Sequence, residues 1–269
     1  MKLIRANIQR YRSISEPTEF DMESDVTALV GKNESGKTAV LQSLYKSNPV
    51  DNAEFDPDLD FPTHKAREIA RGAEIRVTEL TYELDDGDIA DVEAVLCPGV
   101  LEDKCATVVT GFHFNRTRWS VSVNKEIVLD SLRDGLDLPV ADRTKVESVS
   151  TVDGLVETLR SLESETPTAT ATLKKIEAWR DNNPVLAAID VLSKRQPKFV
   201  YFGDYDVMPG KVSIPRLISH RDNEKLERGE EALLALLSMA GVKPEDFSSS
   251  DSHEHLIRQM ENASNAISD

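Results

Sequence analysis

The feature that most constrains this chain is the run Gly31-Lys32-Asn33-Glu34-Ser35-Gly36-Lys37-Thr38. It matches the phosphate-binding loop G-x-x-x-x-G-K-[ST], or P-loop, at every required position. In such a loop the glycines let the backbone curl so that N–H groups point at phosphate oxygens. The lysine reaches the β- and γ-phosphates, and the Ser/Thr hydroxyl ligates Mg²⁺. The sequence therefore predicts a site for a nucleoside triphosphate, with Thr38 as a ligand of the magnesium ion.

The residues on either side of the loop fit this interpretation. The run from Asp25 to Val30 is apolar and suits a buried strand, and it stops at Gly31. Residues 37–46 predict a helix, with Val40, Leu41 and Leu44 on one face. The N-terminus of that helix presents its dipole to the same anion. A strand, loop and helix in this order predict an α/β fold.

The rest of the chain predicts further strands and then helices. Strands are expected over 74–84, 106–114 and 118–129, the last two as a hairpin. Apolar residues at helical spacing predict helices over 152–162, 170–180, 222–240 and 256–267, and one more that starts at Asn183 with Pro184 in its first turn.

We expect three parts: an N-lobe with the P-loop and a β subdomain over 1–139, a helical insertion or arm over 140–196, and a return strand with helices over 197–269. The arm carries Lys174-Lys175 and Lys194-Arg195. It is either a solvated helical insertion or a surface that touches DNA or a partner. The final helix runs to Asp269 without a cap, which suggests that the chain is the N-terminal piece of a longer protein.

Composition limits the classes of partner. Lys and Arg number 32 against 48 Asp and Glu, a net charge of −16. Because nucleic-acid binding rests on neutralising phosphates, this acidity argues against the chain wrapping DNA unaided. No apolar window is long enough to span a membrane, so no membrane partner is expected. Cys97 and Cys105 fit neither a disulfide framework nor a CxxC metal site, which favours a reducing, cytoplasmic location.

The P-loop, taken with Ile8-Gln9-Arg10-Tyr11-Arg12-Ser13-Ile14, resembles the opening of SMC-, RecF- and Rad50-like ABC ATPases. Those families begin with a strand, an aromatic-Arg-Ser/Asn turn and a P-loop of the form GxNxxGK[ST]. The resemblance is strongest to the OLD-family (overcoming-lysogenization-defect) ATPases and their bacterial AAA family relatives, which often carry Glu at the position of Glu34. It covers residues 1–46. It implies an α/β P-loop NTPase of the ABC/SMC head type, of which this chain is the N-terminal lobe.

The resemblance also implies roles for individual residues. Arg12 and Ser13 would lie beside the adenine, ribose or phosphates, and Lys37 and Thr38 would take part in catalysis. The resemblance further implies ATP and Mg²⁺ as cofactors, and a homodimer whose heads sandwich the nucleotide. It implies coupling to an effector such as a nuclease, in DNA repair or antiviral defence. The residues expected to hold the triphosphate are Gly31, Asn33, Glu34, Ser35, Gly36, Lys37, Thr38 and Ala39.

A complete ATPase head of this type also needs a Walker B strand that ends in Asp-Glu and an LSGGQ-like signature. No such signature occurs in the chain, and the apolar runs that end at Asp130, Asp190 and Asp204 are not followed by Glu. Asp204 is the candidate magnesium ligand among them. Asp60 and His64 lie in the loop where ABC heads place a γ-phosphate-sensing glutamine. We therefore expect this chain to bind nucleotide without efficient hydrolysis.

Two other functions stay open at this point. The chain would be a self-contained P-loop kinase or GTPase-like transferase if it carried a lid and an acidic catalytic residue near the loop. A GTPase would also carry an NKxD base-reading motif, which is absent. The remaining alternative is a non-enzymatic interaction module in which the nucleotide is structural.

Overall fold

The structure, a computed structural model, describes residues 1–65, 72–162, 166–203, 211–223, 225–239, 242–247 and 261. Its contacts divide the chain into two compact units. The sheet unit comprises Met1–Val30 and Phe61–Pro197, and the P-loop unit comprises Gly31–Asp60 and Lys198–Asp269. Each unit is described by itself. Within the described residues, no helix is long and apolar enough to cross a membrane.

The sheet unit is built on an antiparallel sheet with the strand order β2-β1-β3-β4-β5. Side chains alternate between buried and more exposed along much of β3 and β4, as expected for strands with one face on a core. At Gly111 a Cβ would lie 2.0 Å from the carbonyl oxygen of Ile75, so only glycine fits between these paired strands. The strands are β1 (Lys2–Ile8), β2 (Thr18–Asp21), β3 (Ile75–Glu83), β4 (Leu101–Phe112) and β5 (Arg118–Val123).

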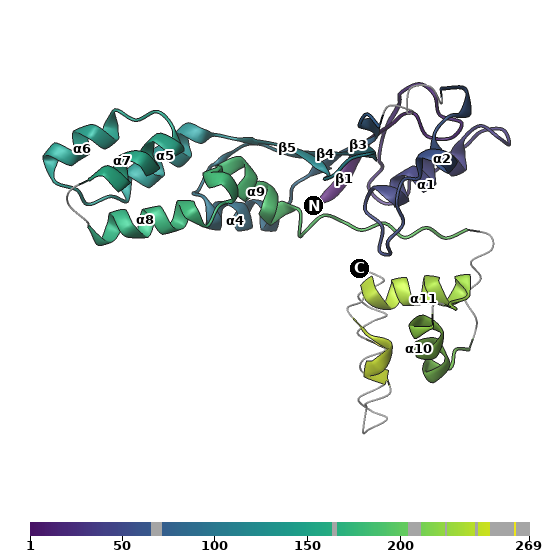
Figure 1. Cartoon of the computed structure of the whole chain (residues 1–269). Coiled ribbons are helices and arrows are strands. Elements are labelled where there is room, and N and C mark those ends of the chain that lie inside the picture. Colours follow the sequence, from purple (N-terminus) through teal and green to yellow (C-terminus); the bar gives the residue numbers. More distant parts are fainter. Residues whose placement is uncertain are drawn as a thin grey trace. The chain divides into compact units, whose positions relative to one another are not determined.

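Helices extend the sheet unit beyond one end of the long strands, where α5 to α8 gather (Figure 1). Most begin at a side chain that accepts a hydrogen bond from the first helical turn, for example Thr151 before α7 and Asn183 before α9. One hydrophobic cluster joins these helices to β4 and β5, with Leu155, Ile176 and Leu192 fully buried. The elements are η1 (Thr63–Lys65), α4 (Asp86–Val95), α5 (Lys125–Asp134), α6 (Val140–Glu147), α7 (Val152–Ser161), α8 (Pro167–Glu177), η2 (Arg180–Asn182) and α9 (Pro184–Leu192).

The P-loop unit contains the P-loop, its helix and the later part of the chain. A parallel bridge pairs Pro49 with Phe199, so the chain returns beside the end of α1. The ring of Tyr45 lies 6.0 Å from that of Tyr201. The helices are α1 (Lys37–Ser47), α2 (Pro57–Asp60), α10 (Ile214–Asp222), α11 (Arg228–Met239) and η3 (Pro244–Phe247).

Several expected elements differ from the structure. The strand expected over 118–129 ends at Val123, because the Asn124 side chain accepts hydrogen bonds from the next backbone amides and starts α5. The helix expected over 222–240 begins at Arg228, and Asp222 instead ends α10. The helix expected over 256–267 lies outside the described residues, apart from Glu261.

The three-part division into 1–139, 140–196 and 197–269 stays a prediction. Helices α6 to α9, which fall inside 140–196, share one hydrophobic cluster with α5 and with β5 of the sheet. The contact units place a boundary between Pro197 and Lys198 and assign Gly31–Asp60 to the later unit.

Candidate nucleotide-binding site

The P-loop is a tight loop that leads directly into α1. The Ser35 amide donates to the carbonyl oxygen of Lys32 at 3.2 Å and closes a turn. Gly36, just before the helix, has φ of 92°, in the left-handed region that favours glycine. At Gly31 a Cβ would lie 2.7 Å from the Ser35 hydroxyl oxygen, so a larger residue would force the loop open. Both motif glycines are therefore required by the observed curl.

Lys37 folds back over the loop that precedes it. Its Nζ donates to the carbonyl oxygen of Gly31 at 2.9 Å and to that of Lys32 at 2.8 Å. The ammonium group is thus held against the backbone of the loop by two neutral acceptors. A phosphate oxygen is a stronger acceptor for this cation, because a hydrogen bond between charged partners is roughly twice as strong as one between neutral groups.

The N-terminus of α1 supplies further donors. The hydrogen bond from the Val40 amide to the Gly36 carbonyl, at 3.0 Å, is the first of the helix, so the amides of Lys37, Thr38 and Ala39 have no acceptor from within it. Gly36 offers no side-chain cap and no acidic residue lies in the first turn. Thr38 is exposed, and its hydroxyl makes no hydrogen bond within the described residues. These free amides, one ammonium and one hydroxyl fit a triphosphate with Mg²⁺.

Buried contacts hold α1 in place behind this N-terminus. Ala39, Val40 and Leu44 are buried. At the far end, Lys46 Nζ lies 2.5 Å from an Asp60 carboxylate oxygen, and Asp60 is fully buried. The same oxygen accepts from the Asp56 amide at 3.1 Å. Asp60, considered above for γ-phosphate sensing, therefore joins the end of α1 to α2.

Arg12 and Ser13 form the two-residue turn of a small hairpin in the sheet unit. Tyr11 and Ile14 flank this turn and exchange backbone hydrogen bonds of 2.9 and 2.8 Å. Arg12 has φ of 48° and places its guanidinium 5.4 Å from the centre of the Tyr11 ring. Because this turn and the P-loop belong to different units, contact of Arg12 and Ser13 with the nucleotide remains a prediction.

The apolar run before the P-loop is not a strand in this structure. Residues 25–30 have no strand partner within the described part of the chain, and Val26 and Val30 are 78% and 91% exposed. The expected buried strand at this position is therefore wrong here. A strand keeps its form through hydrogen bonds to a neighbour, which apolar side chains alone do not supply.

The three candidates for the Walker B aspartate lie in different parts of the chain. Asp130 lies on α5 and Asp190 on α9, so neither follows a strand. Asp204 lies outside the described residues, and its role as a magnesium ligand stays a prediction. His64 falls in η1 of the sheet unit.

A family model described as "AAA ATPase domain" matches residues 1–195. The chain belongs to this family and is an ATPase. The match includes the P-loop, the sheet and α4 to α9, and it agrees with the expected α/β P-loop NTPase fold. Membership of the OLD family within this class remains a prediction.

The other comparisons add little to this assignment. No curated protein matches this ATPase. One similar solved structure is described as "Structural biochemistry of ATP-driven dimerization and DNA stimulated activation of SMC ATPases". It is 14% identical, with a TM-score of 0.27, and the alignment covers 59% of this chain and 99% of the other.

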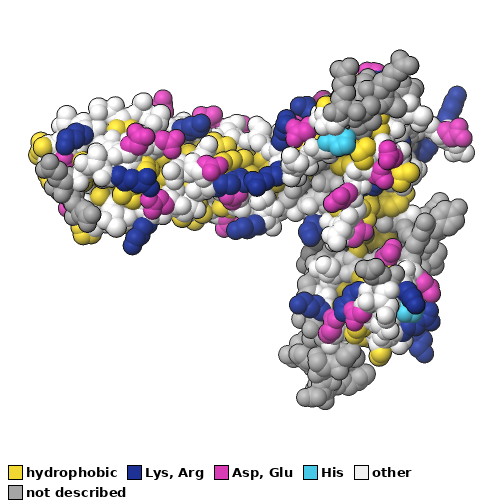
Figure 2. Space-filling model, viewed as in Figure 1, with side chains coloured by type: hydrophobic (Ala, Val, Ile, Leu, Met, Phe, Trp, Pro, Cys, Tyr) yellow, Lys and Arg dark blue, Asp and Glu magenta, His cyan; other side chains and the backbone are white. Residues whose placement is uncertain are grey.

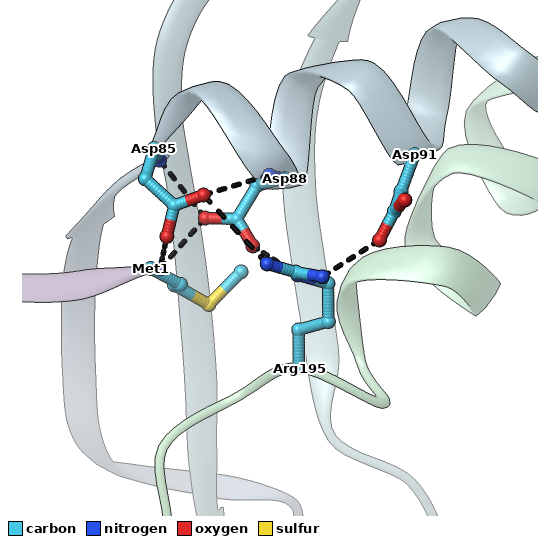
Figure 3. Close-up of polar contacts among 5 residues, drawn as sticks. All are labelled: Met1, Asp85, Asp88, Asp91 and Arg195. Atoms are coloured by element: carbon cyan, nitrogen blue, oxygen red, sulfur yellow. Dashed lines mark hydrogen bonds and ion pairs between the residues drawn. The ribbon is translucent and has the colours of Figure 1, made fainter.

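The sheet unit of this ATPase also contains a charged cluster that was not predicted from the sequence (Figure 3). The amino group of Met1 lies 2.5 Å from Asp85 and 2.7 Å from Asp88, and Arg195 contacts Asp88 at 2.5 Å and Asp91 at 2.7 Å. Asp85 and Asp88 form the capping box of α4, whose spacing is visible in the sequence. Met1 and Arg195 are remote along the chain, and no local pattern identifies them as partners.

Proposed function

We propose that this chain is the nucleotide-holding lobe of an SMC-like ATPase, which dimerises head to head on Mg²⁺-ATP and is coupled to a DNA-processing effector such as a nuclease. The observation that carries the nucleotide-binding part is the P-loop itself. Helix α1 begins at Lys37, and its N-terminus has no side-chain cap. The Lys37 ammonium donates hydrogen bonds to the neutral carbonyl oxygens of Gly31 and Lys32. That combination is a site for the polyphosphate of a nucleotide.

The division of chemical labour follows from what phosphoryl transfer requires. Lys37 and the first amides of α1 hold and orient the β- and γ-phosphates, so their contribution is positioning and charge stabilisation. Magnesium, when bound at Thr38, supplies further neutralisation of the phosphates. No apolar run in the sequence ends in Asp-Glu, and no LSGGQ-like signature occurs. We propose that these elements come from outside this chain and that the chain alone turns over slowly.

The exposed apolar segment before the loop supports the proposal that another strand pairs with it. Val26 and Val30 are exposed, although their run has the composition of a buried strand. We propose that residues 25–30 become a strand when a complementary lobe pairs with them. Such a lobe would bring the Walker B carboxylates beside the P-loop, because the two strands would lie in one sheet.

Isothermal titration calorimetry with Mg²⁺-ATP tests nucleotide binding. Lys37→Ala removes an ammonium that would bond to phosphate, and the loss of such charged hydrogen bonds predicts an affinity roughly 10- to 100-fold lower. Lys32→Ala is the matched control, because Lys32 is an exposed lysine of the same loop. It should change the affinity by less than about threefold, the usual effect of an exposed charge. Equal losses in the two variants would contradict this use of Lys37.

The finer parts of the proposal have separate tests. Light scattering should show a dimer with Mg²⁺-ATP and a monomer without it. The rate of phosphate release should rise in a version of the chain extended through a Walker B segment. Equal turnover with and without that segment would favour the self-contained kinase or NTPase instead. A Lys37→Ala variant that no longer binds nucleotide but still binds the effector would favour an interaction module with a structural nucleotide.

A further inference from the structure

The β4–β5 hairpin differs in charge from the rest of the chain. Although the chain carries 48 acidic residues, none occurs from Lys104 to Lys125. This stretch contains most of β4, the turn and all of β5. The turn and the start of β5 carry Arg116 and Arg118, followed by Trp119. The edge strand and the turn before it thus carry two cations and a large aromatic ring.

These residues line a hollow between β5 and α9. Its volume is about 580 Å³, within the range of roughly 300–1,000 Å³ that is usual for ligand sites. Residues of the strand, of η2 and of α9 all belong to the sheet unit. Figure 2 shows Lys and Arg side chains close to hydrophobic ones on the arm of this unit. The residues that carry the argument are Arg116, Arg118, Trp119, Arg180, Asp181 and Asp190.

Arg180 borders the hollow on its helical side. Its Nη2 pairs with Asp190 at 3.1 Å, which neutralises one of the two carboxylates at the hollow. Its side chain is 37% exposed and lines the hollow, so a ligand has access to the guanidinium group.

The strand side of the hollow offers charge and a stacking surface. Arg116 is exposed and makes no ion pair or hydrogen bond within the described part of the chain. Arg118 pairs with Glu74 and lies 5.0 Å from the centre of the Phe114 ring. Trp119 is half-buried against the helical core, so its ring is held in place.

We propose that this hollow binds single-stranded nucleic acid, with a base stacked on Trp119 and phosphates at Arg116, Arg118 and Arg180. Stacking of bases on aromatic side chains beside a basic groove is how proteins bind single strands. A duplex hides its base faces, so the Trp119 ring favours a single strand. The site does not involve the P-loop, and its occupancy is independent of the nucleotide proposed above.

Fluorescence anisotropy of a labelled 20-nucleotide oligo-dT at low salt tests this site in the full chain. Arg116→Glu should weaken binding at least about tenfold, and it should also reduce the dependence of the affinity on salt, because a phosphate contact is lost. Arg160→Glu is the matched control: Arg160 is an exposed arginine on α7 with the same charge change. It should change the affinity less than about threefold. Equal effects of the two substitutions would overturn the proposal.

Tryptophan emission adds a readout that a purely structural role would not change. The chain has two tryptophans, and Trp179 is buried, so a stacked base should quench the emission of Trp119 alone. Trp119→Phe should abolish this quenching while an aromatic ring still packs at the position. Lys37→Ala should bind the oligonucleotide like the unmodified chain, which separates this test from that of the nucleotide site. Absence of binding, equal affinity for a 20-base-pair duplex, or equal affinity for poly-glutamate would each overturn the assignment to single-stranded nucleic acid.

Discussion

Asp88 is the centre of the charged cluster in Figure 3, and its replacement by Asn gives a sharp test of how the sheet unit is held together. Asp88 is fully buried. One carboxylate oxygen accepts from Arg195 Nε at 2.5 Å; the other accepts from the Asp85 amide at 2.9 Å and lies 2.7 Å from the Met1 amino group. Asparagine has nearly the same shape but only one acceptor oxygen. Its NH₂ group would face one of these donors.

The expected loss is large because both Asp88 and the Met1 amino group beside it are buried, so a weakened contact is not replaced by water. Removing one partner of a buried ion pair costs about 3–5 kcal/mol, and Asn, which keeps one acceptor, should fall near about 3 kcal/mol. In a unit of this size about 1 kcal/mol corresponds to a shift of about 2–4 °C in Tm. Asp88→Asn should therefore lower the Tm of the sheet unit by about 6–12 °C, as measured by circular dichroism near neutral pH.

Asp91→Asn is the matched control for this experiment. Asp91 also pairs with Arg195, at 2.7 Å, but its side chain is 54% exposed. An exposed ion pair contributes only about 0–1 kcal/mol, so the Tm should fall by at most about 4 °C. If both substitutions produced the same shift, burial of Asp88 would not determine its contribution, and the reasoning would be refuted.

Four further outcomes are expected. The hydrogen bond from the Met1 amino group lowers the pKa of Asp85 to about 2, so this stabilisation should be complete above about pH 4 and lost as the pH falls toward 2, seen as a falling urea midpoint. Burial lowers the pKa of the Met1 amino group, but the hydrogen bonds and charges of Asp85 and Asp88 raise it above 8.0 overall. The stabilisation that the charged amino group provides should therefore persist at pH 8 and be lost at higher pH. A urea midpoint that stayed constant at alkaline pH would contradict this. Glu34 has φ of 65° in the P-loop, so Glu34→Gly should relieve backbone strain of about 1 kcal/mol. It also removes a carboxylate from an anion site, so Mg²⁺-ATP should bind more tightly in calorimetry. Glu34→Gln removes only the charge and therefore separates the two effects. Gly111→Ala should destabilise the sheet by more than about 3 kcal/mol in urea unfolding, because its Cβ would meet backbone, whereas Gly99→Ala, with open space but φ of 71°, should cost only about 1 kcal/mol.

Elements whose signals are local were predictable from the sequence. The P-loop helix was expected over 37–46 and is found as Lys37–Ser47. The strand expected over 74–84 is β3, and Pro184 occupies the first turn of α9 as predicted. In each case the signal lies in the spacing of apolar residues or in a cap. The prediction of one strand over 118–129 was wrong for the converse reason. The apolar run continues past Asn124, but Asn124 is the N-cap of α5 and ends the strand.

Contacts between distant parts of the chain could not be predicted in this way. Lys46 and Asp60 are separated by two prolines, and nothing in their spacing identifies the pair. The same holds for Arg195 and Asp88. Each pair is selected by tertiary packing, which buries an Asp and brings a cation beside it. A single sequence contains the charges but not the distance between them.

The P-loop and the segment before it show the difference most clearly, although they are adjacent in the chain. The hydrogen bonds from Ser35 to Lys32 and from Lys37 to Gly31, which shape the loop, join residues within the motif. The loop can therefore form from its own sequence. Residues 25–30 have an equally clear pattern, yet a strand needs hydrogen bonds from a neighbour, and Val30 is left 91% exposed. The phosphate cradle is thus locally encoded, whereas residues 25–30 need a neighbouring strand. If that neighbour carries the proposed Walker B segment, nucleotide binding and efficient hydrolysis should separate in this chain.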